Sequence, residues 1–226
     1  MADNEREADA DRLSAAALKA GDPTGWFEQL YAQAAAGQAV VPWDRGEPNP
    51  LLVEWAAGRP APGRHQRALV IGTGLGYDAA FLAGIGWGTI AFDISDTAIK
   101  AARRRFPQVP VDFRVADLLN PPPEWTGQFD LVLESYTTQA LPIRLRPTIV
   151  SHIARFVADN GTLLILGHGR EESEEVAGPP WPLTRADVES YVSQGLTPVE
   201  IEELRPAPDT WRWRAEFTRT PRLTSR

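Results

Sequence analysis

The chain has 226 residues, 43% of them hydrophobic and 23% charged, which is the composition of a globular protein with a sizeable core. It contains no cysteine, which excludes disulfide bonds, thiolate metal sites and a cysteine nucleophile. The net charge of −7 disfavours nucleic acid as a partner, and no apolar signal region or run of roughly 20 apolar residues is present, so we expect a soluble, cytoplasmic protein.

The first 66 residues carry helix and loop signals only. We expect residues 1–12 to be solvated, residues 14–20 to form a short helix, and a second helix to run from residue 24 or 25 to residue 36. Residues 40–50 are rich in proline and glycine, which predicts a loop that holds Trp43.

From residue 67 onwards, strand and helix patterns alternate. Short apolar segments predict strands at residues 68–71, 89–92, 111–115, 129–133 and 162–166. Helices are expected at residues 77–85, 99–106, 149–157 (ended by Asn160-Gly161) and 183–192, and a closing antiparallel pair at 199–204 and 211–217. This alternation predicts an α/β fold with a mainly parallel sheet and helices on both faces.

The most informative segment joins the first strand to the next helix. The strand runs into three alternating glycines, Gly72, Gly74 and Gly76, which let a ligand approach the backbone closely. By itself this pattern also fits a plain turn. Dinucleotide-binding proteins show G-x-G-x-x-G, whereas here Tyr77 stands at the last glycine position and would hinder the packing of a pyrophosphate. The spacing therefore disfavours an NAD-dependent oxidoreductase.

Two aspartates follow the next two strands. Asp93 ends the second strand about 20 residues beyond the glycines, where a carboxylate can accept hydrogen bonds from ribose hydroxyls. It could instead cap the next helix, although Ser95 or Asp96 is better placed for that. Asp117 follows the third strand and could accept from an adenine amino group with Leu118 against the ring, or it could be a turn aspartate.

Together these residues resemble class I methyltransferases that use S-adenosylmethionine (SAM). More narrowly, the chain resembles the thiopurine S-methyltransferase family and the plant halide and thiol methyltransferases. Residues 41–46 resemble that family's P-W-D-x-G loop, and residues 72–78 resemble its glycine loop, which ends in Asp78. Further matches lie at residues 92–95, 116–118, 129–132 and 178–181.

The resemblance implies a Rossmann-like fold with a seven-stranded sheet, in one compact domain. Residues 1–66 would cap the cofactor, and residues 67–226 would form the SAM-binding core. The implied cofactor is SAM, with S-adenosyl-L-homocysteine as product. Its implied binding residues are Trp43, Gly72, Gly74, Gly76, Asp78, Asp93, Ile94, Asp117, Leu118 and Glu134. Trp26 and Tyr31 are spaced differently from the corresponding family pair, so the motif assigns them no role.

The acceptor is expected to be a small-molecule nucleophile, with sulfur favoured because a thiol needs little help from a general base. Tyr136 and Glu134, at the end of the fourth strand, are the candidate catalytic residues, and His168 is a further candidate base. The histidines show no metal-ligand spacing, and we expect no metal. Methylation of oxygen or of a halide, and a non-catalytic SAM-binding module, remain alternatives. The sequence leaves open whether the protein is a monomer or a homodimer.

Overall fold

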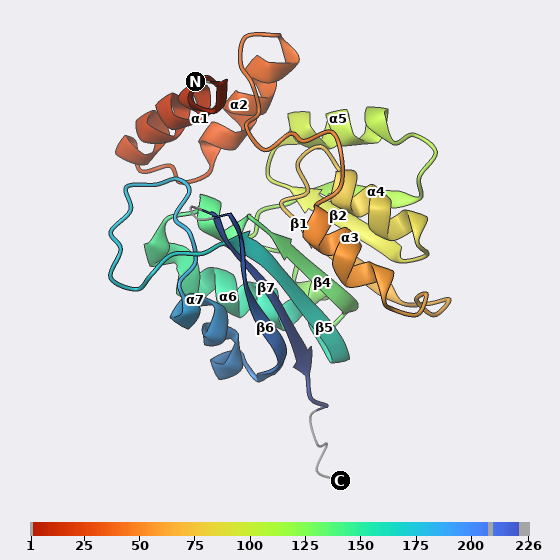
Figure 1. Cartoon of the computed structure of the whole chain (residues 1–226). Helices are drawn as coiled ribbons and strands as arrows, with labels where there is room; N and C mark the ends of the chain where they lie inside the picture. The colour runs from red at the N-terminus through yellow and green to blue at the C-terminus, as the bar shows by residue number, and fades with distance from the viewer. Residues whose placement is uncertain (1, 208–209, 222–226) are drawn as a thin grey trace.

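The computed structural model describes residues 2–207 and 210–221, and the backbone alone for residues 2–6 (Figure 1). Within this part of the chain, one sheet has the strand order β3-β2-β1-β4-β5-β7-β6. The strands are β1 (Arg67–Ile71), β2 (Gly88–Asp93), β3 (Val111–Val115), β4 (Phe129–Ser135), β5 (Val157–His168), β6 (Leu196–Ala207) and β7 (Thr210–Arg219).

The pairing of the strands follows the expected α/β pattern. Strands β1 to β5 pair in parallel, whereas β7 is antiparallel to both β5 and β6. The predicted mainly parallel seven-stranded sheet and its closing antiparallel pair are therefore confirmed. Since the strands are parallel, the carboxyl ends of β1, β2, β4 and β5 meet at one edge, where α/β proteins bind ligands.

Helices cover both faces of the sheet. The α-helices in the described ranges are α1 (Ala2–Lys19), α2 (Gly25–Ala35), α3 (Pro50–Ala57), α4 (Tyr77–Gly84), α5 (Asp96–Arg105), α6 (Arg146–Phe156) and α7 (Arg185–Glu189). One face is buried beneath α6 and α7, and the other beneath α3, α4 and α5. Helix α5 begins as predicted, because the Ser95 hydroxyl accepts a hydrogen bond from the Ala98 N–H at 3.0 Å.

The N-terminal segment differs from its prediction. Residues 1–12 were expected to be solvated, with a short helix only at residues 14–20, but α1 is helical from Ala2 and lies beside α2 beyond the end of the sheet (Figure 1). Ala10, Leu13 and Ala17 share one face of α1 and pack in a cluster with Leu30 of α2. Alanine, glutamate and arginine also favour a helix in this stretch.

The loop predicted for residues 40–50 ends at a helix that the sequence reading missed. The Asn49 side chain caps α3 by accepting the Leu51 N–H at 3.0 Å, and Pro50 occupies the first helical position. Leu52 of α3 is fully buried against the sheet. Residues 1–66 are therefore not all part of a cap, because α3 belongs to the helical layer of the sheet.

Two boundaries in the second half also differ from prediction. Asn160-Gly161 was expected to end a helix that runs to residue 157, but α6 ends at Phe156 and β5 begins at Val157. Asn160 has a positive φ of 63°, at an irregularity in the β4–β5 register. The helix expected at residues 183–192 is the short α7, which continues as a 3₁₀ helix over Ser190–Gln194. No helix in the described ranges has the length and apolarity of a membrane span.

The Asn49 cap allows a test of how far this side chain stabilises the start of α3. Asn49→Ala is expected to lower the free energy of unfolding by about 0.5–2 kcal/mol, because one N–H of α3 loses its acceptor. Asn49→Ser keeps an oxygen at the cap and should restore most of that loss. Urea denaturation of the three proteins measures the difference, and equal stability of wild type and Asn49→Ala would contradict the anchoring role.

Candidate functional site

A cavity of about 450 Å³ lies at the carboxyl ends of four strands. Its walls include Ile71 of β1, Asp93 of β2, Ser135 of β4 and His168 of β5. Side chains of α1 and α2 and the loop before α3 complete the walls. The cavity therefore brings the glycine loop, the P-W-D loop and the ends of the parallel strands together.

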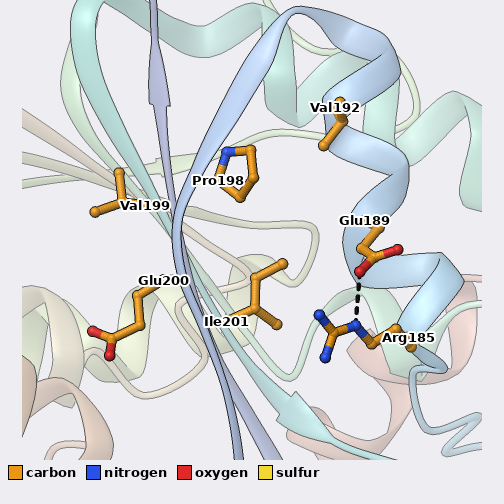
Figure 2. Close-up of a pocket in the computed structure, with 7 residues that line it drawn as sticks. All are labelled: Arg185, Glu189, Val192, Pro198, Val199, Glu200 and Ile201. Atoms are coloured by element: carbon orange, nitrogen blue, oxygen red, sulfur yellow. Dashed lines mark hydrogen bonds and ion pairs between the residues drawn. The ribbon is translucent and has the colours of Figure 1, made fainter.

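A second hollow, of about 530 Å³, lies between α7 and the edge strand β6 (Figure 2). Its Arg185 and Glu189 pair with each other at 2.7 Å, and apolar side chains such as Val192, Val199 and Ile201 make up much of the rest. It lies away from the carboxyl ends of the parallel strands, so we assign the functional site to the first cavity.

The glycine loop reaches the cavity through its backbone. Gly72 and Gly74 have positive φ values of 58° and 52° and both line the cavity. A Cβ atom on Gly72 would collide with the Thr137 side chain, and one on Gly74 would lie 2.7 Å from the Tyr31 hydroxyl. Only glycine fits at these positions, because both the backbone conformation and the available space exclude a side chain.

The Asp93 carboxylate is buried beside this loop and also lines the cavity. One oxygen accepts the Gly74 N–H at 2.8 Å and the other accepts the Ser95 N–H at 2.9 Å. Burial raises the pKa of Asp93 to about 6, and the hydrogen bonds from the backbone of Ser95 and Gly74 oppose that rise. Asp93 thus connects two loops and places a titratable group on the cavity wall.

An aromatic cluster forms the N-terminal wall. The Trp43 indole N–H donates to the Tyr31 hydroxyl at 2.8 Å, and its ring meets the edge of Trp26 at 6.0 Å. Trp43 is 41% exposed, so part of the residue is accessible. Trp26, Phe27 and Tyr31 all line the cavity. The structure therefore places at the site the two aromatic residues, Trp26 and Tyr31, for which the motif gave no role.

Asp78 holds the P-W-D loop against the glycine loop. It lies in the first turn of α4, where its carboxylate accepts the Asn49 N–H at 2.7 Å. The Asn49 amide in turn donates to the Ser135 hydroxyl at 3.2 Å, and both residues line the cavity. The sequence reading missed Asn49, although an Asn-Pro pair before two leucines is a recognisable helix start.

Tyr136 forms the wall opposite the aromatic cluster. It has a positive φ of 60°, which is uncommon for a bulky residue and marks a constrained position. Its ring meets the His168 ring edge-on at 4.9 Å. Its hydroxyl is buried and has no hydrogen-bond partner within the described ranges. Tyr136 is therefore a wall residue whose buried hydroxyl has unused hydrogen-bonding capacity.

Two expected site residues do not line the cavity. Glu134 is buried beneath the loop, where one oxygen accepts the N–H groups of Thr137 and Thr138 at 2.8 and 2.9 Å. Burial raises its pKa to about 7. Gly76 begins α4, and a Cβ atom there would lie 2.9 Å from Ala102 on α5. The structure thus gives Glu134 and Gly76 positioning and packing roles, because neither faces the cavity.

Comparison with known proteins identifies the relatives of this chain. A family model described as thiopurine S-methyltransferase (TPMT) matches residues 28–218. The chain belongs to this family. It is 27% identical over 177 residues to a probable thiol methyltransferase 2 of Arabidopsis thaliana, covering 74% of this chain and 76% of the relative. It is 25% identical over 186 residues to a 2-heptyl-1-hydroxyquinolin-4(1H)-one methyltransferase of Mycobacteroides abscessus, covering 80% and 79%.

Solved structures show the same fold at lower identity. One, described as converting a disulfide bond into a thioacetal group during echinomycin biosynthesis, has a TM-score of 0.69 and 21% identity, over 86% of this chain and 93% of its own. A Burkholderia thailandensis 1,6-didemethyltoxoflavin-N1-methyltransferase with bound S-adenosylhomocysteine has a TM-score of 0.59 and 18% identity, over 76% and 78%. This member of the TPMT family is a SAM-dependent small-molecule methyltransferase with a class I fold, and its cofactor is SAM.

The remaining expected SAM-binding residues of this TPMT-family protein lie on the same cavity. Ile94, Asp117 and Leu118 all line it, next to Asp93. Asp117 also accepts the Leu119 N–H at 2.8 Å, so it is a turn aspartate as well as a wall residue. His152 contacts the Leu118 carbonyl oxygen through Nδ1 at 2.8 Å and thereby fastens this loop to α6.

Arg146 is a further residue that sequence reasoning missed. It is buried on α6, pairs with Asp187, and donates to the carbonyl oxygens of Trp181 and Pro182. It therefore holds the segment that includes Pro179 and Pro180, which both line the cavity. A lone arginine in a helix gave no signal of this long-range contact.

Asp93 predicts the pH dependence of SAM affinity. The carboxylate form accepts hydrogen bonds and attracts a cation, so affinity should be constant well above pH 6 and fall up to tenfold per pH unit below it. Asp93→Asn should weaken SAM binding by roughly 10- to 150-fold at pH 8, or about 1.5–3 kcal/mol, and remove this pH dependence. Calorimetry at several pH values measures both, and an unchanged affinity in the folded variant would contradict the assignment.

Glu134 predicts a pH dependence of stability. Its pKa of about 7 in the folded protein exceeds the ordinary value of 4.5, so the folded state holds the proton more tightly than the unfolded state. This contribution is present in full below pH 4.5 and is lost as pH rises through about 7. Glu134→Gln should remove the loss, so that the variant gains stability relative to wild type between pH 5 and pH 8. Urea denaturation of both proteins at pH 5 and pH 8 tests this. The prediction is refuted if the free energy of unfolding changes by the same amount in wild type and variant between the two pH values.

Proposed function

We propose that this protein transfers the methyl group of SAM to the sulfur of a small thiol. We call the part of the cavity wall at Tyr136 and His168 the acceptor wall. The observation that carries the proposal is that the described residues place no strong base on this wall. Glu134 faces away from the cavity, and burial, followed by the charges of Arg212 and Arg45, lowers the pKa of His168. A thiol suits such a wall, because its ordinary pKa of about 8.5 already supplies some thiolate at neutral pH.

The relatives support a sulfur acceptor and a small substrate. The Arabidopsis relative is named a probable thiol methyltransferase, and a second relative from that plant is named thiocyanate methyltransferase 1. The cavity of about 450 Å³ is of a size that suits a cofactor with a small acceptor. We therefore propose a small-molecule thiol rather than a protein or a nucleic acid.

Our assignment of the cofactor side follows the geometry of the glycine loop. The backbone of Gly72 and Gly74 would hold the amino-acid portion, Asp93 the ribose hydroxyls, and Asp117 and Leu118 the adenine. Ile94 would pack beside the ribose and adenine, and Asp78 would keep the neighbouring loop in place. SAM supplies a methyl group on a sulfonium, which is an excellent leaving group, so the residues of the protein mainly align the reactants and exclude water.

Trp43 is proposed as the cover of the cofactor. Its indole is fixed by Tyr31 while part of the residue remains accessible. A cation over such a ring gains about 0.5–2 kcal/mol, so the sulfonium would be favoured there. Together with α1, α2 and the loop before α3, Trp43 would form the cap over the cofactor.

Oxygen methylation is the second candidate. The Mycobacteroides relative is named for a hydroxyquinolinone, a flat ring system that carries a hydroxyl group. His168 lies beside Tyr136 on the cavity wall and could take a proton from such an oxygen. A panel of thiols, halides and hydroxylated quinolines, each tested with purified protein and SAM, separates the two candidates. Binding of SAM with no turnover of any acceptor would favour a non-catalytic module.

A pH–rate profile tests the thiol proposal directly. With two thiols of different pKa, the rate should rise with pH toward each thiol's own pKa, because the thiolate is the nucleophile. Tyr136→Phe should raise KM about 2- to 10-fold through loss of one hydrogen bond and leave the profile in place. A profile that stays fixed while the acceptor changes would point to an enzymic base, and His168→Ala would be the next variant to measure.

A further inference from the structure

Arg45 occupies the variable position of the P-W-D-x-G loop and lines the cavity. Its guanidinium carbon lies 5.8 Å from the centre of the Tyr136 ring, on the wall where the hydroxyl of Tyr136 has no partner within the described ranges. Arg45 is therefore the residue that brings a permanent positive charge from the cofactor-side loop to the acceptor wall.

The nearest acidic residue in the sequence is already engaged elsewhere. Asp44 accepts the Gly46 N–H at 3.2 Å and pairs with Arg105 at 3.7 Å. Within the described ranges, no carboxylate forms an ion pair with Arg45, and its guanidinium lies over the face of the Tyr136 ring. The charge of Arg45 is thus available to a ligand.

The charge of Arg45 acts on two opposite parts of the cavity. Burial raises the pKa of Asp78 at the start of α4, and the charge of Arg45 is among the influences that oppose this rise. Burial lowers the pKa of His168 at the end of β5, and the charges of Arg212 and Arg45 lower it further. Other charged or titratable groups around this space come from the same loop, α4, the end of β4 and β7. They are Asp44, Glu47, Tyr77, Tyr136 and Arg212.

We propose that Arg45 binds the ionised acceptor against Tyr136 and lowers the pKa of the acceptor thiol. This inference rests on the proposed function. The thiol proton passes to solvent, and the thiolate electron pair forms the new bond to the methyl carbon. The bond from that carbon to the sulfonium breaks, and its electron pair stays on the sulfur of S-adenosylhomocysteine. Arg45 is a specificity-determining residue for acceptors that can ionise.

The bound acceptor can be titrated without turnover. The probe is thiophenol, which ionises closer to neutral pH and whose thiolate absorbs in the ultraviolet, added to the complex of the protein with S-adenosylhomocysteine. The pKa of the bound probe should lie below its value in solution. In Arg45→Ala it should return toward the solution value by about one pH unit, a tenfold change in the ionisation constant. Arg45→Lys, which keeps the charge, should retain much of the shift.

Arg104→Ala is the matched control, because it removes the same charge from the exposed face of α5 outside the cavity. It should leave the pKa of the bound probe unchanged. A probe pKa that is equal in wild type and Arg45→Ala overturns the role of Arg45, whatever the turnover. A shifted pKa with no methyl transfer from SAM overturns the thiol methyltransferase function alone. Failure of the probe to bind the wild-type complex overturns both.

Discussion

Two buried carboxylates on either side of β1 fix the position of the glycine loop. Asp93, at the end of β2, accepts the N–H of Gly74, and Glu134, near the end of β4, accepts the N–H groups that place Thr137 against Gly72. Burial removes each carboxylate from water and raises both pKa values, and the hydrogen bonds from backbone N–H groups offset only part of this rise. The loop is therefore held from both sides before any ligand binds. The same anchoring by Glu134 sets the turn that places Tyr136 on the wall.

The parts of the site that could be predicted from sequence depend on local chemistry. The spacing of Gly72 and Gly74 after an apolar strand reflects a backbone conformation that strongly favours glycine, and Asp93 follows from strand order in a parallel sheet. The apolar pattern of β4 likewise reflects burial on both faces. These constraints act within a few residues or through a regular topology, so the glycine loop, the succession of strands and the fold class were predicted.

The parts that could not be predicted depend on contacts between distant segments. Glu134 sits at a strand end like a catalytic carboxylate, but the turn after it places the Thr137 and Thr138 N–H groups over it. Arg146 holds a loop through the carbonyl oxygen of Trp181, which lies 35 residues further along the chain. Helix α1 is stabilised by its packing on α2, which its own weak apolar pattern did not indicate. Tertiary contacts of this kind have no local signature.

The charges in the cavity fit a methyl donor that is a cation and an acceptor that ionises. Carboxylates line much of the wall, at Glu7, Asp11, Asp44, Glu47, Asp78, Asp93 and Asp117. SAM carries a net positive charge, whereas its product carries none, so these carboxylates favour entry of the donor and release of the product. The same field opposes an anionic acceptor. Arg45, the one arginine or lysine on the wall within the described ranges, stands beside Tyr136, where an ionised acceptor would need it. If the acceptor is the proposed thiolate, this guanidinium would offset the surrounding negative charge at the point of approach.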